Sequence, residues 1–491
     1  MVEAEGDECW ARFCGLTSAS YPLPVPTKRR SEDEVDLFSW RVLKPVVWSL
    51  VAAVPLVCFQ LVVAVVRYVL RLPASAGVTF VHADTARNSF LVKRLRDTVA
   101  RMPPPTGWCH SGDLATLAPF VLFGPDETVR YERRWLRVHG APAPDGPRGW
   151  ALRGSGGGDD DEAVAIDASF PAAGAWQEGP VFLVLHGLNG GSAEPYVLDF
   201  VRRANDRGFA VFVMIGRGLM RTPVRFNPFT GARTADVGAT VAALRASYGD
   251  RLCLVGNSMG GVICENYVAK AGADCGLASC VALSGTLCSE KILGPCGDRS
   301  RNLWQPALTY SLKDSFTKPC LDLLARKGVD VGPILDAKSI NDFDVAQVCP
   351  LFGYPSLTGP EGYYTDMAAA GAGDAAGLAK LARIAVPTLL VHGADDPITP
   401  IAAQLPDDLP AAKNVVLLRT DVGGHTGWPR GADPREHRWR FMVDVAVDFA
   451  VAAHASRPFR VDVGDGPIFT KGGMPRQTPR SRAAAAGTPA P

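Results

Sequence analysis

Short apolar runs alternate with helical segments over the middle and C-terminal parts of the chain. The runs show no alternation of apolar and polar residues, which is typical of strands buried on both faces of a sheet. They are Val181 to Leu185, Ala210 to Ile215, Leu252 to Val255, Cys280 to Leu283, Thr388 to Val391 and Val415 to Leu418. Helical periodicity is found in Pro195 to Arg207, Thr234 to Ser247 and Gly261 to Ala271. This order predicts an α/β fold with a mostly parallel, doubly wound sheet.

A longer apolar run, from Val46 to Val66, precedes this region. Its 21 residues contain no charge, and Ser49 and Gln60 are its only polar residues. A helix of this length rises about 30 Å, the thickness of the hydrocarbon core of a bilayer. We therefore expect a transmembrane anchor helix over residues 46–72 and a single-pass membrane protein; a buried core helix is the alternative. Basic residues flank both ends, so the pattern leaves the sidedness open.

The remaining segments differ in composition from these two parts. Residues 1–45 are polar and contain a proline-rich stretch, which predicts a flexible N-terminal segment. From Gly154 to Glu162 the sequence is GSGGGDDDE, typical of a surface loop between two strands. Residues 456–491 are rich in Pro, Gly, Arg and Ala without periodicity, which predicts a disordered tail. One large domain over residues 78–455 is expected between the anchor and the tail.

The composition is that of a globular protein, because 47% of the residues are apolar and 21% are charged. The 51 Lys and Arg residues balance 50 Asp and Glu residues, so the net charge is only +1. A chain without a basic excess has no general attraction for phosphate backbones, which argues against a nucleic-acid partner. The 12 cysteines are scattered, with no Cys-x-x-Cys pair and no Cys/His cluster of metal-binding spacing. We therefore predict no metal site.

A candidate nucleophile follows the strand-like run Leu252 to Val255. The next residues, Gly256 to Gly261, have the sequence GNSMGG, a Gly-x-Ser-x-Gly motif between a strand and a helix. The small residues of such a turn allow a sharp backbone bend that exposes the serine hydroxyl above the sheet edge. Ser258 is therefore the candidate nucleophile, and a glycine-rich turn without chemistry is the alternative.

A serine nucleophile needs a base and an acid that orients the base, and in enzymes with this turn they follow in the order Ser, Asp, His. Asp395 and Asp396 follow the fifth apolar run, and His425 follows the sixth. The carboxyl ends of parallel strands share one edge of the sheet, where these residues can meet Ser258. His425 is the candidate base, because the other histidines precede these positions or lie in the last helical stretch.

Acyl transfer also requires donors for the oxyanion, usually two backbone N–H groups. One is expected from Met259, the residue after the nucleophile. The second is expected from the loop after the first apolar run, His186 to Ser192, whose sequence is HGLNGGS. Leu188 is the expected donor in this loop, and the glycines around it allow the backbone to approach a substrate closely.

These motifs, taken in order, resemble the membrane-anchored α/β-hydrolase-domain proteins, a branch that comprises types 1, 2 and 3 and the YheT-like proteins. Besides the anchor, the HGLNGGS loop and the serine turn, the resemblance rests on a series of short motifs. They are Arg217-Gly218, Asp342-Phe343-Asp344, Phe352-Gly353-Tyr354, Tyr363-Tyr364, Val386-Pro387-Thr388, Asp395-Asp396-Pro397 and Gly424-His425. The stretch from Gly140 to Trp176 departs from the family, because it is longer and richer in Gly and Asp.

The resemblance implies an α/β-hydrolase fold with a cap at about residues 287–381, between the sixth and seventh strands of the family. The family's acid has the pattern Gly-x-x-Asp with a proline four residues later, which Gly393, Asp396 and Pro400 match. The resemblance therefore favours Asp396 as the acid, with Asp395 holding the loop.

By resemblance, the substrates are carboxylic esters with acyl chains, such as acylglycerols or phospholipids of the membrane that holds the anchor. We expect a serine hydrolase in which Ser258, Asp396 and His425 act through an acyl-enzyme, with Leu188 and Met259 as oxyanion donors. This chemistry needs no cofactor or metal. Two alternatives keep the same residues: an acyltransferase, in which an alcohol replaces water, and a non-catalytic lipid-binding protein on a hydrolase scaffold.

Overall fold

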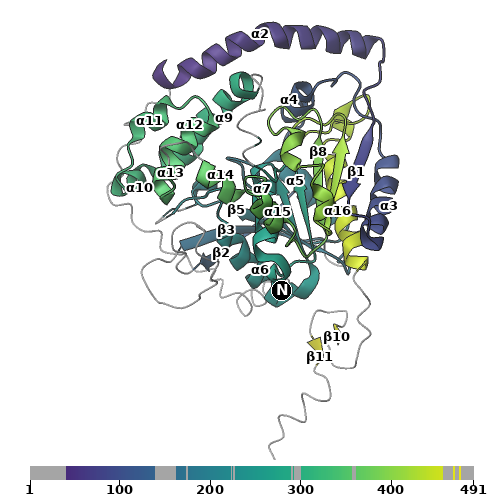
Figure 1. Cartoon of the computed structure of the whole chain (residues 1–491). Coiled ribbons are helices and arrows are strands. Elements are labelled where there is room, and N and C mark those ends of the chain that lie inside the picture. The colour runs from purple at the N-terminus through teal and green to yellow at the C-terminus, as the bar shows by residue number, and fades with distance from the viewer. Residues whose placement is uncertain are drawn as a thin grey trace, which may run out of the picture. The chain divides into compact units, whose positions relative to one another are not determined.

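Figure 1 shows the computed structural model of the chain, which describes residues 40–138, 162–172, 175–222, 224, 227–288, 291, 300–355, 361–456, 468–469 and 475–476. The chain divides into two units, Met1–His454 and Ala455–Pro491. In the second unit, β10 (Ile468–Phe469) pairs antiparallel with β11 (Pro475–Arg476). Most of the predicted N-terminal segment, nearly all of the predicted Gly-rich acidic loop and most of the predicted tail lie outside the described residues.

A sheet of nine strands lies at the centre of the first unit, within the part that the structure describes (Figure 1). Its strand order is β1-β9-β8-β7-β6-β4-β5-β3-β2. The strands are β1 (Val78–His82), β2 (Glu132–Val138), β3 (Glu162–Ser169), β4 (Val181–Leu185), β5 (Val211–Ile215), β6 (Leu252–Asn257), β7 (Ser279–Leu283), β8 (Thr388–Gly393) and β9 (Val415–Thr420). Neighbours from β5 to β9 in this order are parallel, whereas β1, β2 and β3 pair antiparallel. The predicted mostly parallel sheet is confirmed.

The six predicted strands are the parallel ones. β2 and β3 lie on either side of the loop from Gly154 to Glu162, which was expected to join two strands whose bounds were not predicted, and β1 was not predicted. β2 is an edge strand and carries Arg133 and Arg134. An edge strand is open to water on one side and tolerates charge, so it has no continuous apolar run. β3 lies next to it and is buried, but it contains Asp167, whose carboxylate accepts a hydrogen bond of 2.7 Å from Arg133 Nε. Because Asp167 is polar and its partner lies on another strand, the sequence of β3 is not a continuous apolar run and did not predict a buried strand.

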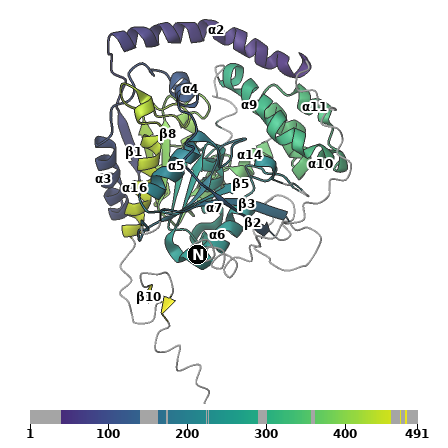
Figure 2. The same ribbon diagram turned by 180° about the vertical axis from the view of Figure 1, so that it is seen from behind.

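Helices cover both faces of the sheet. Successive side chains of a central strand point to opposite faces, so each face has its own hydrophobic cluster. On β4, Phe182 and Val184 pack in one hydrophobic cluster, and Leu183 and Leu185 pack in another. The first cluster includes α3 (Ala86–Ala100), α5 (Pro195–Asp206) and α16 (Arg440–Ala455), and the second includes α6 (Ala235–Tyr248) and α7 (Met259–Ala271). α3 and α16 lie beside β1 in both views (Figures 1 and 2). The predicted helices correspond to α5, α6 and α7, within two residues at each end.

The described part of the segment between β7 and β8 is mostly helical, with short turns between the helices. Its α-helices are α9 (Gln305–Leu312), α10 (Leu321–Arg326), α11 (Val331–Asp336), α12 (Ile340–Phe343), α13 (Cys349–Phe352), α14 (Glu361–Met367) and α15 (Ala375–Leu381). The helices α9 to α14 share a hydrophobic cluster that includes Phe316, Leu324 and Phe343 and that reaches Val262 on α7, whereas α15 packs through Leu381 in the cluster of α6 and α7. The predicted limits of the cap, 287–381, and of the domain, 78–455, stay predictions.

The tyrosine motifs of the resemblance tie this helical segment together and to the loop before α6. Tyr364 donates a hydrogen bond of 2.8 Å to the carboxylate of Asp344, and Tyr363 accepts one of 3.1 Å from the backbone N–H of Gly231. Burial raises the pKa of Asp344 to about 7, and the hydrogen bond from Tyr364 offsets only part of this shift. The motif residues therefore bury a polar contact that holds the segment in place.

The apolar run near the N-terminus forms α2 (Trp40–Val69). Among the described residues, this is the one helix long and apolar enough to cross a membrane, with a mean hydropathy of 2.5 over the best window of Arg41–Val69. α2 begins before the predicted limit of residue 46 and ends before residue 72. Both views show it running alongside α4 (Gly112–Leu122) and α9 (Figures 1 and 2).

Candidate active site

Ser258 occupies a strained turn between β6 and α7. Its backbone angles, φ 54° and ψ −118°, are rarely adopted by residues other than glycine. The turn is held in place because the backbone N–H of Ser258 donates a hydrogen bond of 2.8 Å to the carbonyl oxygen of Leu283 on β7. The strain is therefore maintained by the sheet, and it raises the serine hydroxyl above the carboxyl ends of the strands.

The glycines of the motif allow three backbones to meet at this turn. A Cβ atom on Gly256 would lie 2.2 Å from the carbonyl oxygen of Gly260. A Cβ atom on Gly260 would lie 2.4 Å from the carbonyl oxygen of Leu185 and 2.6 Å from that of His186. These neighbours are backbone atoms and cannot rotate away, so both positions require glycine.

His425 lies after β9 and contacts Ser258 directly. Its Nε2 atom is 2.7 Å from the Ser258 hydroxyl oxygen. The backbone N–H of His425 donates a hydrogen bond of 2.8 Å to the Thr116 hydroxyl on α4, which fixes the residue from a distant part of the chain. The imidazole is placed to accept the proton of the serine hydroxyl.

Asp396 lies after β8, and its carboxylate oxygen is 2.8 Å from the other ring nitrogen of His425, Nδ1. The same carboxylate accepts hydrogen bonds from the backbone N–H groups of Ile398 and Thr399 and from the Thr399 hydroxyl, at 2.8 to 2.9 Å. Burial alone would raise the pKa of Asp396, but His425 and these donors outweigh it and hold the pKa below its ordinary value. Asp396 is therefore an ionised acceptor for the imidazole N–H.

Asp395 is adjacent in sequence but has different partners. Its carboxylate accepts hydrogen bonds of 2.8 and 2.9 Å from the backbone N–H groups of Gly423 and Gly424, directly before His425. Burial raises the pKa of Asp395, and these two N–H groups offset part of the shift. In this geometry Asp396 contacts the imidazole, and Asp395 holds the loop that carries it.

The loop after β4 forms the opposite wall of the site. Leu188 and Met259 both line the pocket that contains Ser258. Met259 is the first residue of α7, so its backbone N–H has no acceptor within the helix and is available to a ligand. The loop is fixed at Gly187, whose N–H donates a hydrogen bond of 2.8 Å to the Tyr196 hydroxyl.

His186, in the same loop, has a structural contact pattern. Its Nε2 atom accepts a hydrogen bond of 3.1 Å from the backbone N–H of Gly216, and its Nδ1 atom is 2.8 Å from the carbonyl oxygen of Gly187. Burial lowers the pKa of His186, so the ring is neutral with its proton on Nδ1. The structure therefore does not bring this histidine to the serine.

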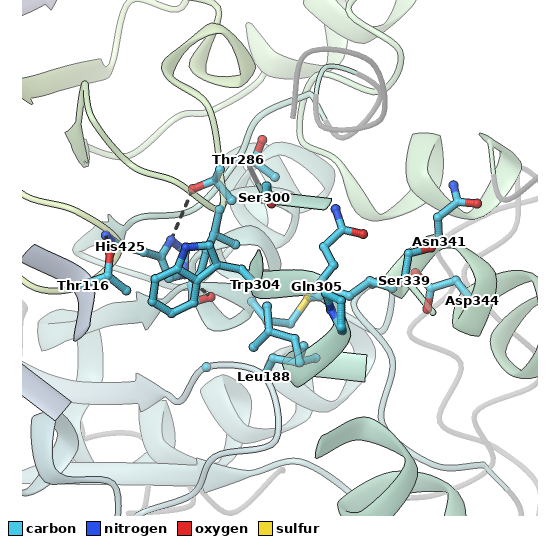
Figure 3. Close-up of a pocket in the computed structure, with 18 of the residues that line it drawn as sticks. Thr116, Leu188, Thr286, Ser300, Trp304, Gln305, Ser339, Asn341, Asp344 and His425 are labelled. Atoms are coloured by element: carbon cyan, nitrogen blue, oxygen red, sulfur yellow. Dashed lines mark hydrogen bonds between the residues drawn. The ribbon is translucent and has the colours of Figure 1, made fainter. Parts of the chain in front are cut away.

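A pocket of about 1220 Å³ surrounds the serine hydroxyl. In Figure 3, His425 and Thr116 lie at one end, Ser339, Asn341 and Asp344 lie at the other, and Trp304 lies between them. The lining also includes apolar side chains, among them Leu117, Phe120, Leu188 and Met259. The pocket thus combines apolar and polar side chains around the serine.

In the part of the chain that the structure describes, the potential metal ligands are not gathered in one place, and most cysteines are buried. No group of three or more His, Cys, Asp or Glu side chains is arranged there to hold a metal ion. Of the cysteines described, Cys58 on α2 is exposed and the others are buried.

Three residues that support the site were not predicted. Thr116 holds the backbone of His425, Tyr196 holds Gly187, and the Thr399 hydroxyl donates to Asp396. Thr399 lies three residues after Asp396, so an Asp-x-x-Thr spacing at the end of a strand would have been a usable signal. Thr116 and Tyr196 carry no local signal, because their partners are distant in sequence or are backbone atoms.

A buried carboxyl group lies behind the site, on α7. Glu265 is fully buried, and its side chain lies close to Gly285. Burial raises the pKa of Glu265 well above its ordinary value, and the backbone of Thr286 offsets only part of the shift. Glu265 is therefore protonated in the folded protein over a pH range in which the unfolded chain carries it ionised.

Comparison with a family model supports the fold. The family model of the α/β-hydrolase fold matches residues 180–315. The chain is 28% identical over 342 residues to phospholipase ABHD3 of Homo sapiens, covering 68% of this chain and 75% of that protein. It is 27% identical over 275 residues to a monoacylglycerol lipase of Saccharomyces cerevisiae, covering 53% and 57%. Among solved structures, a bacterial brefeldin A esterase aligns at 15% identity over 80% of this chain and 93% of its own, with a TM-score of 0.40.

The close backbone contact at Gly260 predicts a stability difference between two helical glycines. Gly260→Ala should lower the free energy of unfolding by about 1–3 kcal/mol, because the new methyl group overlaps two carbonyl oxygens. Gly238→Ala on α6 is the matched control, since its Cβ would have only Tyr267 at 3.5 Å. It should raise stability by about 0.5–1 kcal/mol, because alanine favours the helix. Denaturant unfolding measures both, and equal effects would contradict the packing at Ser258.

The buried Glu265 predicts a pH dependence of stability. Because the pKa of Glu265 is higher in the folded chain than in the unfolded chain, its protonated form contributes to stability. This contribution is fully present below the unfolded pKa, about 4.3 for glutamate, and is lost as the pH rises through the folded pKa. Glu265→Gln should remove the loss, so its free energy of unfolding falls less than that of the wild type as the pH rises. Glu436→Gln, at an exposed position, is the control and should keep the wild-type slope. Parallel curves for wild type and Glu265→Gln would refute the prediction.

Proposed function

The chain belongs to the α/β-hydrolase-domain family and is a carboxylic ester hydrolase, and we propose that it is a membrane-bound serine lipase acting on acylglycerol or phospholipid esters. The observation that carries the proposal is the continuous hydrogen-bonded line from Asp396 through His425 to Ser258. Its two contacts measure 2.8 and 2.7 Å, and it ends at a hydroxyl that faces the pocket. The base and the nucleophile are thus in contact before any substrate binds.

In the first half of the reaction, His425 Nε2 takes the proton of the Ser258 hydroxyl while the serine oxygen attacks the ester carbonyl carbon. The carbonyl oxygen becomes an oxyanion, which accepts hydrogen bonds from the backbone N–H groups of Leu188 and Met259. The ionised Asp396 stabilises the imidazolium and keeps Nδ1 protonated. Collapse of the intermediate breaks the ester bond, and His425 returns its proton to the departing alcohol. Ser258 is left as an acyl ester.

In the second half, His425 takes a proton from water while the hydroxyl oxygen attacks the acyl carbon. The second tetrahedral intermediate is stabilised by the same two backbone N–H groups. It collapses to release the free acid, and the proton on His425 returns to the Ser258 oxygen. The nucleophile, the base and the oxyanion donors are all supplied by the protein, so no cofactor or metal is required.

The lipid substrate is supported by the relatives and by the lining of the pocket. The relatives at 27 to 28% identity include a phospholipase and a monoacylglycerol lipase. Beside Ser258, the apolar side chains of Leu117, Phe120 and Leu188 suit an acyl chain. The polar lining at Ser339 and Asn341 suits the glycerol or head-group end of the lipid. We assign membrane association to α2, which the sequence predicts to be a single-pass anchor.

A serine-directed probe tests the nucleophile. Full-length protein in detergent should react covalently with a fluorophosphonate, and Ser258→Ala should not, because the probe bonds to an activated serine oxygen. The variant should also lower the turnover of a short-chain soluble ester by about four orders of magnitude or more. Circular dichroism serves as the folding control. Labelling of Ser258→Ala at the wild-type level would place the nucleophile elsewhere.

The two neighbouring carboxylates offer a matched pair of variants. Asp396→Asn should lower kcat about 10⁴-fold, because an amide beside Nδ1 favours the wrong imidazole tautomer. Asp395→Asn should stay within about tenfold of the wild type, because the amide oxygen still accepts hydrogen bonds from Gly423 and Gly424. Both are measured as kcat and KM on the same soluble ester. The reverse order would make Asp395 the acid.

A further inference from the structure

The helix α2 has two unlike faces. Its most buried residues are Val42, Ser49, Ala53, Gln60 and Ala64. These positions are seven or four residues apart, so they form one stripe along the helix. Both polar residues that interrupt the apolar run, Ser49 and Gln60, lie on this stripe. Most other residues of the apolar run are exposed or partly exposed, and the basic residues of α2 lie near its two ends.

The stripe is bonded to the hydrolase domain. The Ser49 hydroxyl donates a hydrogen bond of 3.2 Å to the carbonyl oxygen of Leu303. The Gln60 amide donates one of 3.0 Å to the carboxylate of Asp113 on α4 and accepts one of 3.1 Å from the Ser111 hydroxyl. The second oxygen of Asp113 accepts a hydrogen bond of 2.9 Å from the indole of Trp304. The middle of α2 is thereby joined to both α4 and the helical segment between β7 and β8.

Contacts at both ends of α2 complete this attachment. Near the N-terminal end, the Arg41 guanidinium forms an ion pair with Asp336 on α11. Near the C-terminal end, Arg67 donates a hydrogen bond of 2.8 Å to the carbonyl oxygen of Gly107. α2 therefore lies along the domain for its whole length. A helix held in this way cannot cross a bilayer unless the domain enters the hydrocarbon core or these bonds break.

Exposed apolar side chains cover α2 and α4, and three of them also line the pocket. On α2 they are Val47, Trp48, Leu50, Val51, Val54, Val57, Phe59, Leu61, Val62, Val65, Val66, Tyr68 and Val69, and on α4 they are Leu117, Phe120, Val121 and Leu122. Trp48, Leu117 and Phe120 line the pocket although they are 59%, 47% and 43% exposed, so they mark its opening. An apolar surface of this extent marks an interaction site.

We propose that α2 lies in the plane of the membrane surface and forms, together with α4, the surface by which the domain docks on the bilayer. The occupant of this apolar surface is a bilayer that contains anionic lipids. α2 has no acidic residue, and the exposed basic side chains of Lys44 within it and of Arg71 just after it complement anionic head groups. The buried stripe keeps the polar groups of Ser49 and Gln60 away from the lipid.

This arrangement rests on the proposed lipase function and adds the route of the substrate. Because the mouth of the pocket lies within the docking surface, a lipid ester moves from the bilayer past Trp48 and Phe120 to Ser258 without crossing water. The acyl chain exchanges one apolar environment for another along this route. Soluble esters reach the same serine without membrane contact.

Thiol labelling of the two ends of α2 tests its orientation. Lys44→Cys and Arg71→Cys are made singly in the full-length chain, in a background in which the reactive or undescribed cysteines are replaced. These replacements are Cys9→Ser, Cys14→Ser, Cys58→Ser and Cys296→Ser. Sealed membrane vesicles from the expressing cells are treated with a charged, impermeant maleimide before and after detergent. In-plane docking makes both ends label alike. Labelling of one end only before detergent would establish a single-pass helix and overturn the proposal.

Variants on α4 test the docking surface without touching the predicted anchor. Val121→Glu and Leu122→Glu lie outside the pocket lining and should keep the wild-type turnover of a soluble short-chain ester. The two substitutions are combined in a double variant, which is tested on vesicles of phosphatidylcholine with phosphatidylserine. It should cleave lipid at about one tenth of the wild-type rate or below, because the two carboxylates oppose insertion of α4 into the apolar layer. The matched control is Trp176→Glu, an exposed apolar position before the amino end of β4, away from the mouth. It should cleave vesicle lipid like the wild type.

The outcomes separate this proposal from the proposed function. If the wild-type protein did not turn over the soluble ester at all, the proposed lipase function itself would be refuted. Ser258-dependent turnover of the soluble ester, combined with unchanged vesicle cleavage by the double variant, would refute only the docking surface. Equal loss in the double variant and in Trp176→Glu would also refute it, because the effect would then not be specific to the mouth.

Discussion

The close approach of α7 to the backbones of β4 and β6 is the constraint on which the site depends. Gly260 lies against the carbonyl oxygens of Leu185 and His186, with no room for a Cβ atom. This contact fixes the start of α7, and with it the strained angles of Ser258 and the direction of the Met259 N–H. It also sets the position of the loop after β4 that faces the serine. A wider approach would separate Ser258, the proposed nucleophile, from the proposed oxyanion donors.

The loops at the carboxyl ends of β8 and β9 show how hydrogen-bond donors and a neighbouring imidazole can outweigh the effect of burial on the pKa of a carboxyl group. Asp395 and Asp396 are neighbours in sequence, and both are withdrawn from water. The pKa of Asp396 is held down by His425 and by N–H donors, whereas burial dominates at Asp395 and raises its pKa. The ionised carboxylate of Asp396 thus faces the imidazole of His425, and the carboxylate of Asp395 accepts hydrogen bonds from the loop that carries this histidine. The difference lies in which groups each one faces.

α4 links the candidate chemistry to the pocket mouth. The Thr116 hydroxyl accepts the backbone N–H of His425, and the next residue, Leu117, is both exposed and part of the pocket lining. Asp113, on the same helix, bonds to Gln60 on α2 and to Trp304. A single short helix therefore holds His425, the proposed base, borders the pocket and binds the long apolar helix α2. Its position is set by contacts that come from three separate parts of the chain.

The sequence by itself determined the six parallel strands, the serine turn and the order of the candidate residues. Strands buried on both faces require continuous apolar runs, and a sharp turn requires small residues, so both leave local patterns. The choice between Asp395 and Asp396 came by resemblance, and only the tertiary structure shows which carboxylate faces His425. Thr116 lies 309 positions from its partner, and no local pattern records such a contact. Ser49 and Gln60 appeared only as interruptions of an apolar run, because a sequence shows that a helix has polar residues but not which surface they meet.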